Sequence, residues 1–188
     1  CGSDPDNAGS LPLDTDGDGF CDNGVDTDDD NDGLSDVEED TDGNGVFNLG
    51  DASNLRDSDS DDDGFTDDID NCRLDANPNQ TNTDLTLANQ PGALVQGDQL
   101  GDACDPDIDN DGLSNQVEDT NGNGQFDAAS ELTNLRDPDT DNDGDIDSAD
   151  NCPNVSNGNQ LNSDGANDGG NACDLDDDND GLSDIEEG

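Results

Sequence analysis

Acidic side chains recur along this chain at a spacing that suits the binding of hard cations. Residues 28–39 carry aspartate at the first, third, fifth and ninth positions, glycine at the sixth and glutamate at the twelfth. Calcium takes six to eight oxygen ligands. A loop with side-chain oxygens at positions 1, 3, 5 and 9, a carbonyl at 7 and a carboxylate at 12 can wrap one ion if glycine permits the turn at 6. The spacing therefore predicts a calcium-binding loop.

Five loops match this template in full. Three of them end in glutamate at position 12, and two end in aspartate, which has less reach. Since random acidity has no reason to set glycine at every sixth position, we expect all five loops to bind calcium. Their expected ligands are Asp28, Asp30, Asp32, Asp36 and Glu39; Asp107, Asp109, Asp111, Asn115 and Glu118; Asp176, Asp178, Asp180, Asp184 and Glu187; Asp59, Asp61, Asp63, Asp67 and Asp70; and Asp139, Asp141, Asp143, Asp147 and Asp150.

Three further loops carry fewer charges, and we expect them to bind calcium more weakly or to share ligands with neighbouring loops. They bring the expected total to about eight calcium sites. In two more stretches, residues 82–105 and 162–174, an insertion or a shortening breaks the spacing, and the sequence leaves open whether they bind metal. The weaker loops contain Asp14, Asp16, Asp18 and Asp22; Asp40, Asp42, Asn44, Asn48 and Asp51; and Asp119, Asn121, Asn123 and Asp127.

The composition supports metal binding, because the chain cannot build a conventional core. Only 25% of its residues are apolar and 2% aromatic, and 54 acidic residues face three basic ones, for a formal net charge of -51. Carboxylates about 5 Å apart repel by roughly 3 kcal/mol per pair at an effective dielectric near 20, so compaction requires counter-charges. Without them such a chain is expected to be disordered.

The same composition excludes several classes of function. A chain without a basic patch is not expected to bind nucleic acid or anionic membrane surfaces, and no apolar stretch approaches the length of a membrane span. The sequence has no His, Lys or Tyr, and metal spacing accounts for the paired carboxylates, so we do not expect an enzyme. Arg56 and Arg136 are expected to pair with nearby carboxylates.

The chain is also repetitive. Residues 32–47 reappear as residues 111–126, 79 positions further on, and a third copy begins at Asp176. The end of the chain runs into its start in register, which favours a longer array or end-to-end packing of copies. A start at Cys1 without Met favours a piece of a longer precursor. We expect residues 1–27 to end a preceding repeat, residues 28–106 and 107–175 to form two repeats, and residues 176–188 to begin the next.

The order of the loops argues against EF-hands, which place a helix on each side of every loop. Glu39 closes one loop and Asp40 opens the next, and Glu118 and Asp119 repeat this arrangement. Flanking helices therefore have no room. We expect successive coils and turns held together by ions.

Residues 59–80 and 101–105, with residues 139–154 and 171–174, resemble the thrombospondin type 3 repeat. The likeness rests on the Asp-x-Asp-x-Asp-Gly-x-x-Asp-x-x-Asp-Asn-Cys run of residues 59–72, then Asn-Pro-Asn-Gln and Gly-Asp-Ala-Cys-Asp. It implies an irregular fold with little regular secondary structure, calcium-filled acidic loops, and disulfides between cysteines close in sequence.

Six cysteines without His nearby favour disulfides and an oxidising compartment. Their spacings support local pairing of Cys1 with Cys21, Cys72 with Cys104, and Cys152 with Cys173. The alternative for Cys1 is the lipidated first residue of a surface lipoprotein, which would leave Cys21 unpaired.

The sequence thus predicts tandem calcium-binding loops in an elongated, irregular fold stapled by local disulfides. We expect an extracellular or cell-surface structural protein, a calcium-rigidified rod that forms the body of a fibril or an adhesin stalk and self-associates end to end. The alternatives are a calcium-dependent adhesion or ligand-binding module and a surface lipoprotein spacer. Asn79 and Asn154 begin glycosylation sequons and are possible glycan sites.

Overall fold

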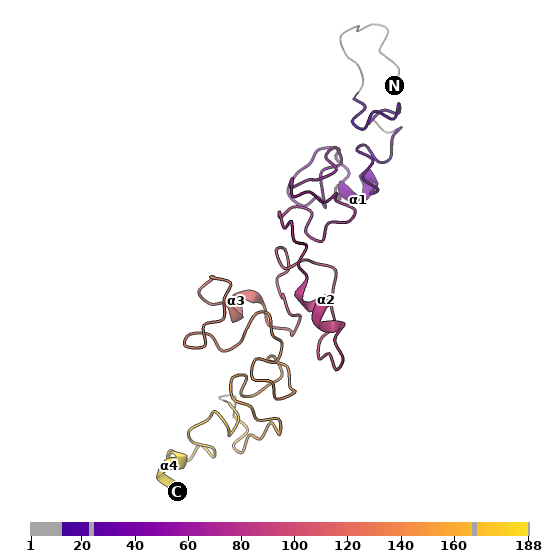
Figure 1. The fold of residues 1–188 in the computed structure, drawn as a ribbon. Helices are drawn as coiled ribbons and strands as arrows, with labels where there is room; N and C mark the ends of the chain where they lie inside the picture. Colours follow the sequence, from indigo (N-terminus) through magenta and orange to yellow (C-terminus); the bar gives the residue numbers. More distant parts are fainter. Residues whose placement is uncertain (1–12, 23–24, 167–168, 188) are drawn as a thin grey trace. The chain divides into compact units, whose positions relative to one another are not determined.

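The computed structural model describes residues 13–22, 25–166 and 169–187, and regular secondary structure is scarce within these ranges (Figure 1). The helices are α1 (Asp36–Glu39), α2 (Thr83–Ala88), α3 (Asn115–Glu118) and α4 (Asp184–Glu187). Two isolated β-bridges, Leu49 with Asp51 and Asn134 with Asp137, are the only strand-like pairings among the described residues. The predicted irregular fold is confirmed. The chain divides into two compact units, Cys1–Thr81 and Asn82–Gly188.

Three of the helices lie inside the acidic loops and do not flank them. Each covers positions 9 to 12 of a loop that ends in glutamate, so it is a single turn. In α1 the sequence Ser-x-x-Glu explains the start of the helix, because the Glu38 carboxylate accepts hydrogen bonds from the Ser35 N–H at 3.1 Å and hydroxyl at 2.7 Å. These helices are single turns inside the loops, which agrees with the prediction that there is no room for helices on either side of a loop.

The buried residues are mostly acidic. Apolar side chains that are buried within the described ranges amount to a few separate positions, among them Leu55, Val95 and Leu135. Fully buried carboxylates are as prominent as these, and Glu39 and Asp109 are each 0% exposed. Large apolar side chains meanwhile lie on the surface. The interior of each unit is therefore built around carboxylate groups. No helix in the described part of the chain combines the length and apolar character needed to cross a membrane.

Candidate metal centres

Many acidic side chains of the loops use one carboxylate oxygen to hold the backbone in place. In residues 59–70, Asp61 Oδ1 accepts the Asp63 N–H at 3.1 Å, and Asp63 Oδ1 accepts the Phe65 N–H at 2.9 Å. Asp59 Oδ2 accepts the N–H of Gly64 at 3.0 Å, and Gly64 has a φ of 103°, which glycine adopts most readily. Short side-chain to backbone bonds of this kind fold the loop inward.

The second oxygen of many of these carboxylates is buried without a hydrogen-bond partner. Asp61 Oδ2 and Asp70 Oδ2 are in this state in residues 59–70, and Asp141 Oδ2 and Asp150 Oδ2 are in the same state in residues 139–150. A buried charged oxygen without a partner is costly, by roughly 1 to 3 kcal/mol or more. The pattern recurs in the loop of residues 28–39, in Asp28 Oδ1, Asp30 Oδ2, Asp32 Oδ2 and Glu39 Oε2.

These oxygens gather in clusters of the size that one ion requires. Oxygens that each lie about 2.4 Å from a calcium ion are at most about 4.8 Å apart. In the clusters, the candidate ligand atoms all lie within 4.8 Å of one another. The residues therefore fit calcium in both oxygen chemistry and spacing. Clusters of this kind include Asp107, Asp109, Asp111 and Glu118; Asp14, Asp16 and Asp18; Asp28, Asp30 and Asp32; Asp32, Glu39 and Asp67; and Asp40, Asp42 and Asp51.

One cluster joins two successive loops, which the sequence template did not anticipate. Asp67 was expected to bind metal within its own loop, but its carboxylate lies with those of Asp32 and Glu39 from the preceding loop. In the other unit, Ser148 N–H donates to Asp111 Oδ2 at 3.1 Å and connects the corresponding pair of loops. The glutamate-ended loops of residues 28–39 and 107–118 are therefore each joined to the aspartate-ended loop that follows.

The residue at position 9 closes its loop. Asp67 Oδ1 accepts the N–H of Ser60, at position 2, at 3.0 Å, and Asp147 Oδ1 accepts the N–H of Thr140 at 2.9 Å. The hydroxyls of Ser60 and Thr140 donate to the second oxygen of the same carboxylates. The calcium-ligand role expected of position 9 remains a prediction. The same bond to position 2 is made by Asp22, Asp36, Asn115 and Asp184.

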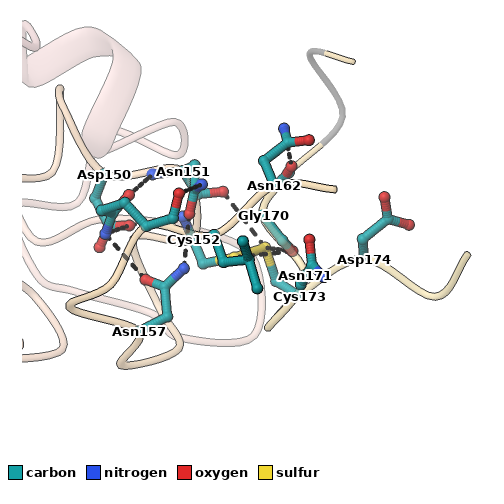
Figure 2. Close-up of a disulfide and its surroundings, with 12 residues drawn as sticks. Asp150, Asn151, Cys152, Asn157, Asn162, Gly170, Asn171, Cys173 and Asp174 are labelled. Atoms are coloured by element: carbon teal, nitrogen blue, oxygen red, sulfur yellow. Dashed lines mark hydrogen bonds between the residues drawn. A yellow bond between two sulfur atoms is a disulfide. The ribbon is translucent and has the colours of Figure 1, made fainter. Parts of the chain in front are cut away.

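A different set of bonds holds position 12 of the aspartate-ended loops, beside a disulfide (Figure 2). Asp150 Oδ1 accepts the Cys152 N–H at 2.7 Å and the side-chain amide of Gln160 at 2.8 Å. Gln160 Oε1 in turn accepts the Asn151 N–H at 2.8 Å. Cys152 is bonded to Cys173, 21 residues later, with their Cα atoms 5.8 Å apart. We call Asp150, Asn151 and Gln160 the glutamine latch, and Asp70, Asn71 and Gln80 form the same bonds.

Comparison with known families decides what these loops are. The profile of the thrombospondin type 3 repeat matches residues 39–80, 96–117 and 118–160, more than half of the chain. The chain belongs to the thrombospondin type 3 repeat family. A search of curated proteins found no match. Thrombospondin type 3 repeats are calcium-binding, structural, extracellular-type modules, so the chain is a calcium-binding module of this type.

The cysteines fit the extracellular character of thrombospondin type 3 repeats. Cys21, Cys72 and Cys104 are disulfide-bonded, in addition to the bond between Cys152 and Cys173. Cys1 lies outside the described residues. The expected pairing of Cys72 with Cys104 and of Cys1 with Cys21 remains a prediction.

The glutamates of these type 3 repeats are strongly perturbed. Burial, together with the charges of Asp109 and Asp111, raises the pKa of Glu118 to about 8. Burial, with the charges of Asp30 and Asp32, raises the pKa of Glu39 to about 7. In both glutamates the metal-free protein favours the neutral acid because like charges crowd a dry site, and a divalent cation reverses this preference.

The loops with fewer charges are formed as well, with one residue that the sequence analysis missed. In residues 119–131, Asn121 Nδ2 donates to Asp127 Oδ2 at 3.0 Å and to Glu131 Oε1 at 2.8 Å. Glu131 is only 4% exposed and was not among the expected ligands. The repeat in the sequence could have identified Glu131 as a candidate ligand, because Glu131 lies 80 positions after the expected ligand Asp51.

The arginines of these repeats pair with carboxylates, as expected. Arg56 lies 3.0 Å from both Asp22 Oδ2 and Asp29 Oδ2. Arg136 Nε lies 3.6 Å from Asp102 Oδ2. Because the chain has only three basic residues, arginine can neutralise only a few of its carboxylates. Bound cations can supply counter-charge to the others.

Proposed function

We propose that this chain is a calcium-rigidified structural segment, the body of a cell-surface fibril or the stalk of an adhesin. The observation that carries the proposal is the set of buried carboxylate oxygens without partners, which occupy the interior in place of apolar side chains. Because ions order these loops, calcium sets the stiffness of the segment. Extracellular calcium suffices even for affinities of about 10⁻⁴ to 10⁻³ M.

The proposed ligands are the carboxylates of the loops at about eight sites, and Glu39, Asp67 and Asp109 are the most deeply buried of them, each 0% exposed. The proposed structural repeats are residues 28–106 and 107–175, with partial copies at residues 1–27 and 176–188. The offset of 79 positions between the copies supports this division. We further propose that copies associate end to end. The sequons at Asn79 and Asn154 carry exposed asparagines, which suits glycan attachment.

Small-angle X-ray scattering of the oxidised protein tests calcium-dependent ordering. With saturating calcium we expect a narrow distribution of sizes and a defined cross-section. With chelator the radius of gyration should approach the ~46 Å of an unfolded chain of 188 residues, apart from the restriction by disulfides. Identical scattering curves in calcium and in chelator would contradict the proposal.

Electron microscopy and sedimentation of the same sample test the fibril. End-to-end filaments or a concentration-dependent increase in mass, reversed by chelator, are the expected results. If the chain stays monomeric at high concentration in calcium, the proposal of self-association is wrong. The proposed role as the stalk of a single long chain would then remain. Calcium binding would be untouched by that outcome.

A further inference from the structure

Residues 40–51 and 119–131 carry asparagine at position 5, where the five complete loops carry aspartate. Asn44 and Asn123 hold this position, and each is followed by the glycine of position 6. We call residues 40–51 and 119–131 the asparagine loops. At position 5 they differ from a complete loop only by an NH2 group in place of an oxygen, so a chemical change at this one group would remove the difference.

An Asn–Gly pair can undergo deamidation without an enzyme. The backbone nitrogen of the glycine attacks the side-chain carbonyl carbon of the asparagine, and its proton leaves with the NH2 group as ammonia, which closes a five-membered succinimide ring. Water then opens the ring. Opening at the new bond gives aspartate, and opening at the original backbone bond gives isoaspartate. Glycine favours the attack because it has no Cβ to obstruct it.

The side-chain oxygen of each asparagine already makes the bond that aspartate makes in a complete loop. Asn123 Oδ1 accepts the N–H of Gln125, at position 7, at 2.7 Å. In the complete loop of the same unit, Asp111 Oδ1 accepts the N–H of Leu113 at 2.6 Å. Asn44 makes the equivalent bond in the other unit, at 2.8 Å. The backbone of an asparagine loop is therefore already shaped for aspartate at position 5.

The side-chain nitrogen of Asn123 takes the place of the second aspartate oxygen, and it contacts an expected ligand. Asn123 Nδ2 donates to Asp127 Oδ2 at 2.9 Å. The NH2 group has only donors to offer, and here it engages a carboxylate oxygen that could bind a cation. Deamidation would replace this hydrogen bond with a second negative charge beside Asp127, and such a pair of carboxylates favours a cation between them.

A second Asn–Gly pair lies in the same loop. Asn121, at position 3, is followed by Gly122, and its Nδ2 donates to Glu131 Oε1 at 2.8 Å. Position 3 of the other asparagine loop is Asp42, 79 positions earlier, and Asp42 lies in a cluster of candidate ligands with two other carboxylates. Deamidation of Asn121 would therefore give residues 119–131 a carboxylate that the other asparagine loop already has.

The folded loop restrains the two groups that react. Gly124 N–H donates to Asp119 Oδ2 at 2.5 Å, and Asn123 N–H donates to Asp119 Oδ1 at 3.1 Å. The glycine nitrogen must leave this carboxylate before it can attack the asparagine side chain, so the loop has to open first. Asn123 and Gly124 are both exposed, so water reaches the pair once the loop opens. An ion that binds only the closed loop slows the reaction, because it lowers the open fraction.

We propose that Asn123 is a site of spontaneous deamidation, that the reaction gives residues 119–131 the position-5 carboxylate of a complete loop, and that bound calcium holds the reaction back. Asn44 is the equivalent site in the other unit. The effect of calcium rests on the proposed calcium-binding role of the chain, whereas the deamidation itself requires only that the loop opens. A chain that has spent time without calcium would then bind calcium more tightly when calcium returns.

The test follows the oxidised chain at pH 8 in saturating calcium and in chelator. Peptide mass spectrometry detects the mass gain that accompanies replacement of NH2 by OH. At a free calcium concentration of 100 Kd, conversion of Asn123 should be about 100-fold slower than in chelator. Asn157, also followed by glycine, is an internal reference, because it lies between the disulfide-bonded Cys152 and Cys173. Its conversion should respond less to calcium.

Two results would overturn the inference. One is the absence of conversion at Asn123 in chelator, and the other is equal conversion in calcium and in chelator by a chain that binds calcium. A wild-type chain that binds no calcium would instead overturn the proposed function, and deamidation in chelator would still be measurable.

Asn123→Asp and Asn123→Gln separate the reaction from its effect on calcium binding. Glutamine has one more methylene group and cannot close the five-membered ring, so Asn123→Gln should show no conversion at residue 123 and should bind calcium no more tightly than wild type. Asn123→Asp is the product itself. It should tighten the weakest step of calcium binding by about tenfold, because it adds a full negative charge close to a divalent ion. Competition with a chromophoric chelator measures this step.

Asn44→Asp is the matched variant in the other unit, and it should tighten binding in the same direction. Peptide fragmentation of the aged wild-type chain distinguishes aspartate from isoaspartate at residue 123. If isoaspartate is the sole product, or if Asn123→Asp binds calcium no more tightly than wild type, conversion to a complete loop is wrong.

Discussion

The loops of residues 107–118 and 139–150 share one spacing but are closed in different ways. At position 12 of the first loop, Glu118 is 1% exposed at the end of α3, and both of its carboxylate oxygens are buried without a hydrogen-bond partner. At position 12 of the second loop, the glutamine latch holds Asp150 through bonds from Cys152 and Gln160. The longer side chain of Glu118 reaches the ligand cluster without other support. The shorter side chain of Asp150 is held by residues that lie outside its loop.

This difference teaches that the two kinds of loop depend on calcium to different degrees. The cluster around Glu118 crowds like charges together, so we expect its order to depend on a cation. The glutamine latch and the disulfide at Cys152 are bonds between protein atoms, so we expect them to persist when calcium is removed. We therefore expect glutamate-ended loops to lose order first.

The largest expected effect follows from removing calcium. With chelator at pH 8, exchange of backbone amides in residues 107–118 should accelerate by about 100-fold, the factor that corresponds to a free calcium concentration of 100 Kd. Residues 150–173 should accelerate less, because the latch and the disulfide remain. Hydrogen-exchange mass spectrometry checks both segments at once. Equal acceleration of the two segments would remove the distinction between the loops.

The metal-free protein should lose stability as pH rises. The pKa of Glu118 is about 8 and that of Glu39 about 7, against an ordinary value of 4.5, because burial and neighbouring charges favour the neutral acids. Between about pH 4.5 and 8 the folded metal-free chain binds more protons than the unfolded chain, so stability falls across this window and is greatest below it. Urea unfolding of chelated protein at several pH values measures this.

Because the pKa values of Glu118 and Glu39 are raised, calcium binding should displace protons from these glutamates near neutral pH. Calorimetric titrations in two buffers with different ionisation heats should therefore give different apparent binding enthalpies at pH 7. Equal enthalpies in the two buffers would show that the glutamates are already ionised before calcium binds.

Glu118→Gln should have opposite effects with and without calcium. If the ion is present at 100 times its Kd, its loss removes about 2.7 kcal/mol of stability. In chelator at pH 8 or above the variant should instead be more stable than wild type, since it no longer buries a charge. Asp150→Asn is the matched control, and it should lack the gain in chelator. Urea unfolding followed by circular dichroism distinguishes these outcomes, and a loss of stability under both conditions would argue against a charge effect.

The smallest expected effect concerns the latch. Gln160→Ala removes hydrogen bonds to Asp150 and Asn151, at a cost of about 1 to 2 kcal/mol. The loss should appear in calcium and in chelator alike, because the latch does not need the ion. Gln80→Ala is the matched variant in the other unit. An effect of Gln160→Ala that vanished in chelator would show that the latch forms only around bound metal.

Much of the fold could be predicted from spacing alone, because each loop is a local structure. The irregular backbone and the disulfide of Cys152 with Cys173 follow from residues close in sequence. Contacts between loops could not be predicted in this way. Asp67 lies 35 positions after Asp32 and joins its cluster, which a template of twelve residues cannot express.

Other features were missed because the template treats every acidic residue as a ligand. Position 9 bonds to position 2, as Asp147 does to Thr140, and this backbone bond leaves no trace in a pattern of acidic residues. Residues 85–97 lie between Asp84 and Asp98, so a template of fixed spacing cannot express the hydrogen bond that joins these two aspartates. The template also missed Glu131, because its loop contains one additional residue and Glu131 therefore does not fall on position 12.

Residues 85–97, which include most of α2, begin and end in close contact, because a Cβ added to Gly97 would lie 2.5 Å from the Cα of Leu85. This arrangement makes the protein a scaffold for peptide display. Asp98 N–H donates to Asp84 Oδ2 at 2.8 Å although residues 85–97 lie between the two aspartates, so the chain leaves and re-enters the loop at adjacent points. A foreign sequence grafted between these aspartates would have its ends held together by the host.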